Sequence, residues 1–257
     1  MEFFDCNCYF GRPSKPGESP KVCADVDDLL AELNRAGIVR AIVWSIAQLD
    51  ASPQHGNALL AEAIRPHPNL FGAWTILPPQ TGEIPPDKLI GDMKANRIVA
   101  LNVFPTANRY LPNAVTMGPV LEEMTTRRIP LFYSIKHNQP GLGERGAWAG
   151  VHDLLEDFPE LTVIITDHGS WGSDRYFRPL LENFPRVFVD TAIYFLDGGI
   201  EDLVERYGPG RLLFGSGLPE HFPGGMMLAI RHGEIPENAK TAIASGNLDG
   251  IIKEVRL

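Results

Sequence analysis

Polar side chains gather at the ends of apolar segments that have the length of buried β-strands. Asp167 and His168 follow one such segment, and Glu220 follows another. Carboxylates and an imidazole in these positions can exchange protons with a substrate, so we predict catalytic roles for these three residues. Further polar or aromatic residues at strand ends, or in the loops after them, are predicted to bind a polar substrate: Asn7, Tyr9, Asn102, Ser134, Trp171, Asp190 and His221.

Several of these residues also permit a purely structural role. His168 can simply donate a hydrogen bond to a backbone carbonyl, and Asp167 can cap the helix that follows its strand. Asp190 can pair with an arginine such as Arg175 or Arg178. The sequence leaves both interpretations open, because the surroundings of each side chain decide between them.

The elements that position these residues alternate between strands and helices. Eight short apolar segments are predicted as strands, at residues 2–8, 40–45, 70–76, 98–104, 129–135, 161–167, 186–191 and 211–216. Amphipathic segments between them are predicted as helices, among them residues 25–36, 56–65, 118–128, 147–158 and 199–207. The first helix has Asp25 as its N-cap and Gly37 just after its last turn.

Strand–helix alternation builds either a closed (β/α)₈ barrel or an open doubly wound sheet. No glycine-rich nucleotide-binding loop follows any strand, which removes the best signal for an open sheet. We therefore predict a single-domain (β/α)₈ TIM barrel over residues 1–257. The Pro/Gly-rich stretches 11–20 and 78–86 follow the first and third strands, so they are expected to be loops on the catalytic face.

Composition restricts the partners. The formal net charge of −9, without any run of Lys or Arg, argues against a nucleic-acid binder. No basic and apolar leader begins the sequence, and no segment approaches the roughly 18 apolar residues that cross a bilayer. We expect a soluble, cytoplasmic protein with a small-molecule substrate and no membrane partner, and a homodimer is the commonest assembly for such a chain.

Five segments, in the correct order along the chain, resemble motifs of the amidohydrolase superfamily. Asp5-Cys-Asn7-Cys-Tyr9-Phe-Gly11 is similar to its first-strand motif, Asp-x-His-x-His-x-Gly. Strands ending at Ser134 and at Asp167 resemble the fifth and sixth strands, each of which normally ends in His. The other two are residues 212–219, similar to the eighth-strand Leu-Phe-Gly-Ser/Thr-Asp-x-Pro, and residues 244–252, similar to the closing helix. The branch most similar includes decarboxylases and lactone hydrolases.

The resemblance implies a divalent metal such as zinc, but the matching positions are substituted. They hold Asn7, Tyr9, Ser134, Asp167 and Gly217, with His168 matching the sixth strand only if one residue is inserted. Zinc prefers imidazole, thiolate and carboxylate ligands, and glycine has no side chain with which to ligate. We therefore expect no metal at the usual position and no other cofactor.

Three explanations remain open. The chain is a metal-independent hydrolase or decarboxylase-like enzyme acting on a small polar, carboxylated or lactone-type molecule, or it is an inactive pseudoenzyme or binding barrel. The third is a relocated metal site that uses Cys6, Cys8 or His221. Against the third, alternation along the first strand turns Asp5, Asn7 and Tyr9 inward and both cysteines toward the helices. Asp5 is then expected to support the site rather than to face the substrate.

Overall fold

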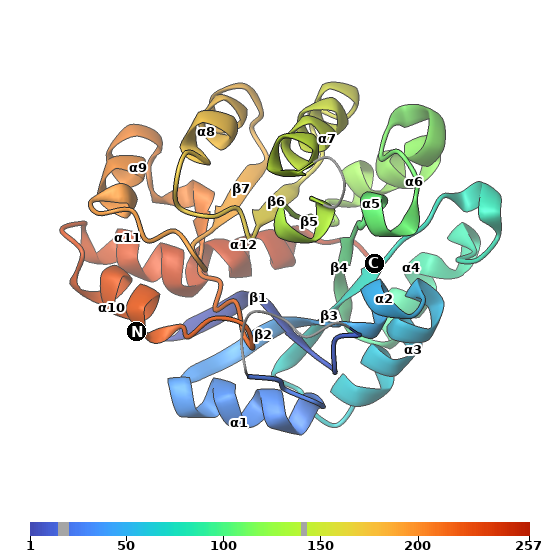
Figure 1. Ribbon diagram of the computed structural model, residues 1–257, viewed down its shortest axis with the longest axis horizontal. Coiled ribbons are helices and arrows are strands. Elements are labelled where there is room, and N and C mark those ends of the chain that lie inside the picture. Colours follow the sequence, from blue (N-terminus) through green and yellow to red (C-terminus); the bar gives the residue numbers. More distant parts are fainter. Residues whose placement is uncertain (15–20, 140–142) are drawn as a thin grey trace.

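Eight parallel strands form one sheet with neighbours in sequence order, β1 to β8, and helices surround it (Figure 1). The computed structural model describes residues 1–14, 21–139 and 143–257. The strands are β1 Phe3–Phe10, β2 Ile38–Ser45, β3 Leu70–Thr75, β4 Ile98–Asn102, β5 Leu131–Ser134, β6 Val163–Thr166, β7 Val187–Asp190 and β8 Leu212–Leu213. The predicted (β/α)₈ TIM barrel is confirmed.

The barrel closes between β1 and the segment that follows the short strand β8. Backbone hydrogen bonds run from the Cys6 amide to the Phe214 carbonyl, 2.9 Å, and from the Tyr9 amide to the Leu218 carbonyl, 3.0 Å. This closure places the end of β8 beside the end of β1, so residues that follow the two strands share one edge of the mouth.

Most of the larger helices follow a strand and cover the outside of the sheet, and α12 is the exception. The larger helices are α1 Val26–Ala36, α3 Pro53–Ile64, α4 Pro86–Ala95, α6 Ala114–Arg127, α7 Gly143–Asp157, α8 Asp174–Asn183, α9 Gly199–Tyr207, α10 Gly224–His232 and α12 Asn247–Glu254. Shorter helical segments are α2 Ala47–Asp50, η1 Pro79–Thr81, α5 Pro105–Asn108, η2 Lys136–Asn138, η3 Pro209–Arg211, α11 Glu237–Thr241 and η4 Ala242–Gly246. The predicted limits of α1 are confirmed, since the Asp25 carboxylate accepts from the Asp28 amide and Gly37 adopts φ 76°.

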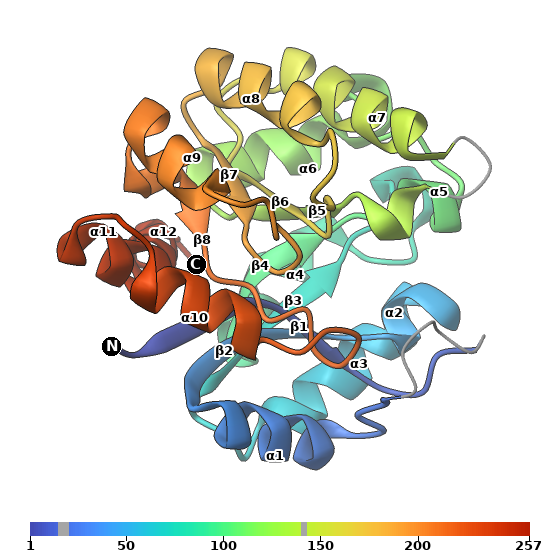
Figure 2. The ribbon, with the colours of Figure 1, turned by 60° about the vertical axis from the view of Figure 1, so that its left-hand side comes forward.

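Two apolar layers hold the barrel together. The outer layer packs the helices on the sheet, whereas the inner one fills the barrel with side chains that include Phe4, Phe132 and Ile164. Leu248 and Ile251 of α12 belong to the inner layer, so this helix closes the end of the barrel opposite the strand C-termini. Figure 2 shows α10, α11 and α12 gathered on the side where the chain begins.

The inward and outward alternation predicted for β1 is wrong for Cys6. The pairing of β1 with β2 shifts register between Asp5 and Cys8. As a result Cys6 lies in the inner layer, while Cys8 packs in the outer one. A bulge of this kind breaks the period of two, and the sequence carries no clear signal for it.

The predicted loops follow β1 and β3. Residues 15–20 of the first stretch, 11–20, lie outside the described residues, while the second contains η1. Along the described part of the chain, no helix has both the length and the apolar character needed to cross a membrane.

Candidate active site

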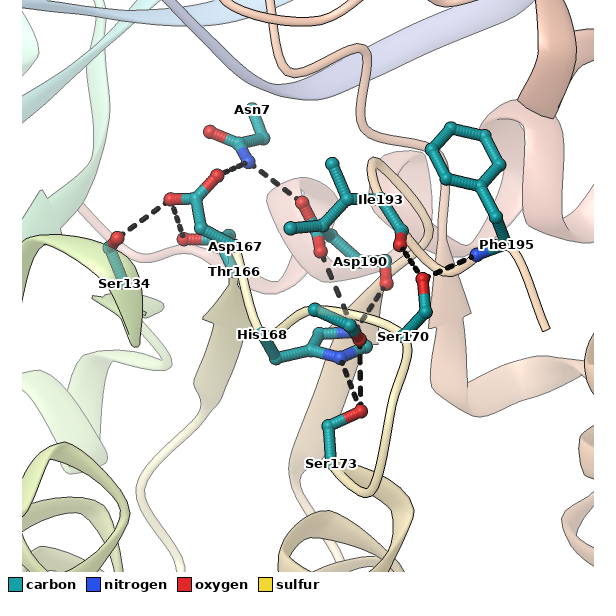
Figure 3. A network of polar contacts seen from close by, with 11 residues as sticks. Asn7, Ser134, Thr166, Asp167, His168, Ser170, Ser173, Asp190, Ile193 and Phe195 are labelled. Carbon is teal, nitrogen blue, oxygen red and sulfur yellow. Dashed lines mark hydrogen bonds and ion pairs between the residues drawn. The ribbon is translucent and has the colours of Figure 1, made fainter. Parts of the chain in front are cut away.

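Asp167 directly follows β6, and its carboxylate accepts hydrogen bonds from three neutral side chains, one of them the Thr166 hydroxyl at 3.3 Å. The Ser134 hydroxyl donates to one carboxylate oxygen at 2.6 Å, and the Asn7 amide nitrogen donates to the other at 2.7 Å (Figure 3). Asp167 adopts φ 54°, a left-handed conformation that costs a non-glycine residue energy and that recurs at functional sites. It does not cap the next helix, because α8 begins only at Asp174. Three predicted site residues from β1, β5 and β6 are thus brought into contact.

A second carboxyl group lies on the other side of Asn7. The same amide nitrogen donates to Asp190 Oδ2 at 2.8 Å, and Asp190 is 1% exposed. Its other oxygen, Oδ1, has no hydrogen-bond partner and lies 3.7 Å from His168 Nε2. Burial, and then the charges of Asp167 and Asp5, raise the pKa of Asp190 well above its ordinary value. Asp190 therefore retains its proton to a higher pH than a solvated carboxyl group.

Asp190 does not pair with an arginine. Arg178, one of the two predicted partners, instead forms ion pairs with Asp174 and Asp202. Asp190 is thus a buried partner of Asn7 in the wall behind Asp167, not a group on the surface of the site.

His168 is built into the wall rather than directed at the cavity. Its Nε2 lies 2.9 Å from the Asp190 carbonyl oxygen, and its Nδ1 lies 3.4 Å from Ser173 Oγ. The ring packs edge-on against Phe177 and beside Tyr194. Burial lowers its pKa, which favours the neutral ring. This geometry matches the structural alternative, a hydrogen bond to a carbonyl, and gives no support to the predicted acid–base role.

Asp167 lies at the edge of a small cavity inside the barrel mouth. Its volume of about 10 Å³ has room for about one water molecule. The lining residues are Cys6, Asn7, Ile42, Trp44, Ala73, Asn102, Phe104, Phe132, Ser134, Thr166 and Asp167. Six of these eleven residues are apolar, so the carboxylate and the hydrogen-bonding groups stand in a partly apolar environment that strengthens electrostatic interactions.

Above the cavity, three elements meet at the mouth. Glu220, in the loop after β8, accepts from the Tyr9 hydroxyl at 2.9 Å and forms an ion pair with Lys136, the first residue of η2. Tyr9 packs against Trp44, and the His137 ring lies edge-on to the Trp44 ring. The predicted residues Glu220 and Tyr9 therefore interact with each other at the mouth, and neither lines the cavity beside Asp167.

The remaining predicted residues lie in different positions relative to the cavity. Asn102 lines the cavity, where its amide donates to the Ala73 carbonyl at 3.4 Å. Asp5 supports the site, as expected, since its carboxylate accepts from the amides of Asn7 and Ser216. Trp171 is 90% exposed and is not among the residues that line the cavity, so its predicted role as a pocket wall finds no support.

His221 occupies space at the eighth-strand position. A Cβ atom on Gly217 would lie 2.9 Å from the His221 ring, and Gly217 adopts φ 66°. The ring therefore occupies the space into which a longer side chain at position 217 would extend.

The side chains at the family's metal position do not fit a metal ion. The Asn7 amide presents hydrogens, not lone pairs, to Asp167 and Asp190. The Tyr9 hydroxyl donates a hydrogen bond to Glu220, and Gly217 has no side chain that could ligate a metal. Among the described residues, no group of three His, Cys, Asp or Glu side chains comes together as a possible metal site. Of the proposed substitutes, the two cysteines do not converge, because Cys6 and Cys8 lie in different layers.

Sequence reasoning did not assign Lys136, Trp44 or Phe104 to the site. Lys136 lies two residues after Ser134, and Trp44 directly precedes a strand-end serine, Ser45. Proximity to a strand end was therefore the available signal. For Trp44 and Phe104 this signal was ambiguous, because large aromatic residues usually belong to a hydrophobic core.

Comparisons with known proteins agree with this architecture. No curated protein matches the chain. Among solved structures, a dihydroxybenzoic acid decarboxylase from Polaromonas sp. JS666, with bound manganese and the inhibitor 2-nitroresorcinol, is 16% identical with a TM-score of 0.78, covering 100% of this chain and 98% of that one. A 2,6-dihydroxybenzoate decarboxylase from Rhizobium is 16% identical with a TM-score of 0.75, covering 98% and 99%. A 4-oxalomesaconate hydratase from Rhodopseudomonas palustris is 18% identical with a TM-score of 0.67, covering 98% and 96%.

At these identities the solved structures show the fold alone. The family is shown by a sequence model described as Amidohydrolase, which matches residues 11–247. Because that match spans most of the sequence, the chain belongs to the amidohydrolase family.

Proposed function

We propose that the chain is a hydrolase or decarboxylase-like enzyme that acts on a small polar or carboxylated molecule and transfers protons through side chains. The observation that carries this proposal is the position of Asp167. Its carboxylate is oriented by Ser134 and Asn7 at the edge of a cavity with room for about one water molecule. A carboxylate oriented in this way can accept a proton from water or a substrate, or return one to carbon.

We call Asp167 and its partners Asn7, Ser134 and Asp190 the floor of the site. Within the floor, Asp190 affects the negative charge beside Asp167. Burial and the charge of Asp167 raise the pKa of Asp190, which favours its protonated form and reduces the repulsion between the two carboxyl groups. The Asn7 amide contacts both carboxyl groups and holds them in place. In this mechanism Asp167 exchanges the proton, and Asn7 with Asp190 positions it.

The metal-free part of the proposal rests on the donor set. The position at which the family binds its metal contains an amide that donates hydrogen bonds, a tyrosine engaged with Glu220 and a glycine. The names of the solved relatives, two decarboxylases and a hydratase, support chemistry on carboxylated molecules in which a proton moves.

A binding barrel without catalysis is the second candidate. It is favoured by His168, whose two ring nitrogens are both engaged within the wall and are therefore not directed at a ligand. Under this alternative, Asp167 would accept a hydrogen bond from a ligand without exchanging a proton.

The deciding experiment is Asp167→Asn, assayed against a panel of carboxylates and lactones. Removal of a general acid or base lowers turnover by about 10²- to 10⁴-fold, so we expect kcat to fall in that range, and thermal melting checks that the variant is folded. The matched control is Asp87→Asn, the same substitution at an exposed residue of α4. Full activity of Asp167→Asn on any substrate found would assign the chemistry elsewhere.

The metal-free mechanism has its own test. The purified protein is analysed for metals and assayed before and after treatment with a chelator. We expect unchanged turnover after chelation. Loss of activity that zinc or manganese restores would show that a metal takes part, whatever the role of Asp167.

A further inference from the structure

The mouth of the barrel holds a carboxylate in the way that a binding site holds one. We propose that Lys136 and Tyr9 form a subsite for a carboxylate of the substrate, and that the chain's own Glu220 fills this subsite when no substrate is bound. The inference rests on the proposed function, since it places the substrate next to Asp167. It adds the residues that select a carboxylate and an internal competitor for them.

The contacts of Glu220 carry the argument. One carboxylate oxygen accepts from the Tyr9 hydroxyl at 2.9 Å, and the other pairs with the Lys136 ammonium group. The three residues come from β1, from η2 after β5 and from the loop after β8. A cation and a neutral hydroxyl donor acting on the two oxygens of one carboxylate make charge-assisted hydrogen bonds, which are stronger than neutral ones.

Tyr9 is a fixed donor in this arrangement. The residue is 6% exposed, and its ring packs with Trp44 and Phe104. Burial and the neighbouring Glu220 raise the pKa of Tyr9, so the hydroxyl remains protonated and able to donate. The hydroxyl therefore stays in place whether the carboxylate it contacts belongs to the chain or to a ligand.

Glu220, in contrast, is held by an exchangeable contact. The side chains of Lys136 and Glu220 are 38% and 18% exposed. Ion pairs with this degree of exposure shift an equilibrium by about fivefold at most, because water competes for both partners. A ligand carboxylate that supplies the same two contacts can thus displace Glu220 at small cost. Once displaced, Glu220 can turn to solvent from its loop after β8.

Charge at the site supports this assignment. Burial lowers the pKa of His137, which favours the neutral form of this neighbouring ring. Lys136 supplies the positive charge directed at the mouth, and Glu220 neutralises it. An organic anion that binds without displacing Glu220 would meet the carboxylates of Glu220 and Asp167, while the Lys136 ammonium group is already paired.

The test measures binding of sodium benzoate by titration calorimetry, with benzamide as the neutral control. Glu220→Gln removes the competitor, so we expect benzoate to bind about fivefold more tightly than to the wild type, and benzamide to bind equally to both. Lys136→Met should lose benzoate binding in either background, and Lys136→Arg should restore most of it. Thermal melting of each variant identifies any that has lost its fold.

Two outcomes would overturn the proposal. One is a Glu220→Gln variant that binds benzoate no more tightly than the wild type, and the other is a Lys136→Met variant that binds it as well as its parent. The measurement needs no turnover, so it is separable from the proposed function. If both proposals hold, the Asp167→Asn variant is inactive yet still binds benzoate. If the wild type turns over a substrate but Glu220→Gln binds benzoate with unchanged affinity, the subsite proposal fails and the proposed function stands.

Discussion

The floor and the mouth of this site hold carboxylates in opposite ways. At the floor, Asp167 and Asp190 share the neutral amide of Asn7, and Asp190 is 1% exposed. At the mouth, Glu220 pairs with a cation in a contact that water reaches. Removing charge from water is expensive, so burial raises the pKa of Asp190 and the two carboxyl groups share a neutral amide, whereas the partly exposed pair at the mouth joins opposite charges.

The contrast teaches where this barrel is rigid and where it is adaptable. The floor residues are connected through buried hydrogen bonds that must be satisfied in the folded state. The mouth residues lie where water can replace any partner that leaves. Substitutions at the floor should therefore act on stability, and substitutions at the mouth on affinity.

The largest effect is expected from Asn7→Leu. Leucine removes the donor of two hydrogen bonds, 2.7 and 2.8 Å long, from two carboxyl groups at once. A hydrogen bond to a charged group contributes about 1.5–3 kcal/mol and one to a neutral group about 0.5–1.5 kcal/mol. We expect the free energy of unfolding in urea to fall by about 2–4 kcal/mol.

Asn102→Leu is the matched control for that change. Asn102 lines the same cavity but makes a single long hydrogen bond, 3.4 Å, to the Ala73 carbonyl. Its replacement should cost about 1 kcal/mol or less. Equal losses at the two positions would show that the shared amide has no special place in the floor.

The next effect concerns pH and Asp190. The groups that face it are Asn7, Asp167, Asp5 and His168. Because its pKa is raised in the folded state, the stability that it contributes is complete below about pH 4 and is lost as pH rises through the folded pKa. Relative to the wild type, Asp190→Asn should therefore gain up to about 1.4 kcal/mol per pH unit in this window.

Urea denaturation of both proteins at intervals from about pH 4 to 7 measures this difference. Asp249→Asn is the control, because pairing with Arg40 lowers the pKa of Asp249 and moves its titration below the window. Its stability curve should run parallel to that of the wild type. A parallel curve for Asp190→Asn as well would mean that Asp190 is ionised throughout.

Much of the fold could be predicted from the sequence because local signals repeat along it. Eight apolar segments gave eight strands, and the residues at their ends brought Asn7, Ser134 and Asp167 together as expected. The bulge that turns Cys6 inward could not be predicted, because one added residue in a strand leaves no periodic trace.

The site was harder because its contacts cross the barrel. His168 was expected to face the substrate, but the left-handed turn at Asp167 directs the next side chain into the wall. Lys136 and Glu220 are 84 residues apart, and only the closed barrel brings them together. Strand ends thus predict which residues reach the site, whereas partners depend on packing between distant loops.

The smallest effect is expected for the coupling free energy between Lys136 and Glu220 at the mouth. A double-mutant cycle of Lys136→Met and Glu220→Gln should give a coupling of about 0.2–1 kcal/mol at low salt, and less as salt screens the charges. The Arg40–Asp249 pair is the control, because two hydrogen bonds of 2.6 and 2.8 Å join its partners and should couple them more strongly. A mouth coupling above about 2 kcal/mol would contradict the comparison, since an ion pair that strong would not be displaced by a substrate carboxylate. A small coupling together with tighter benzoate binding by Glu220→Gln would show that the contact of Glu220 at the mouth is exchangeable. The buried hydrogen bonds of Asn7 at the floor would then be the fixed part of the site.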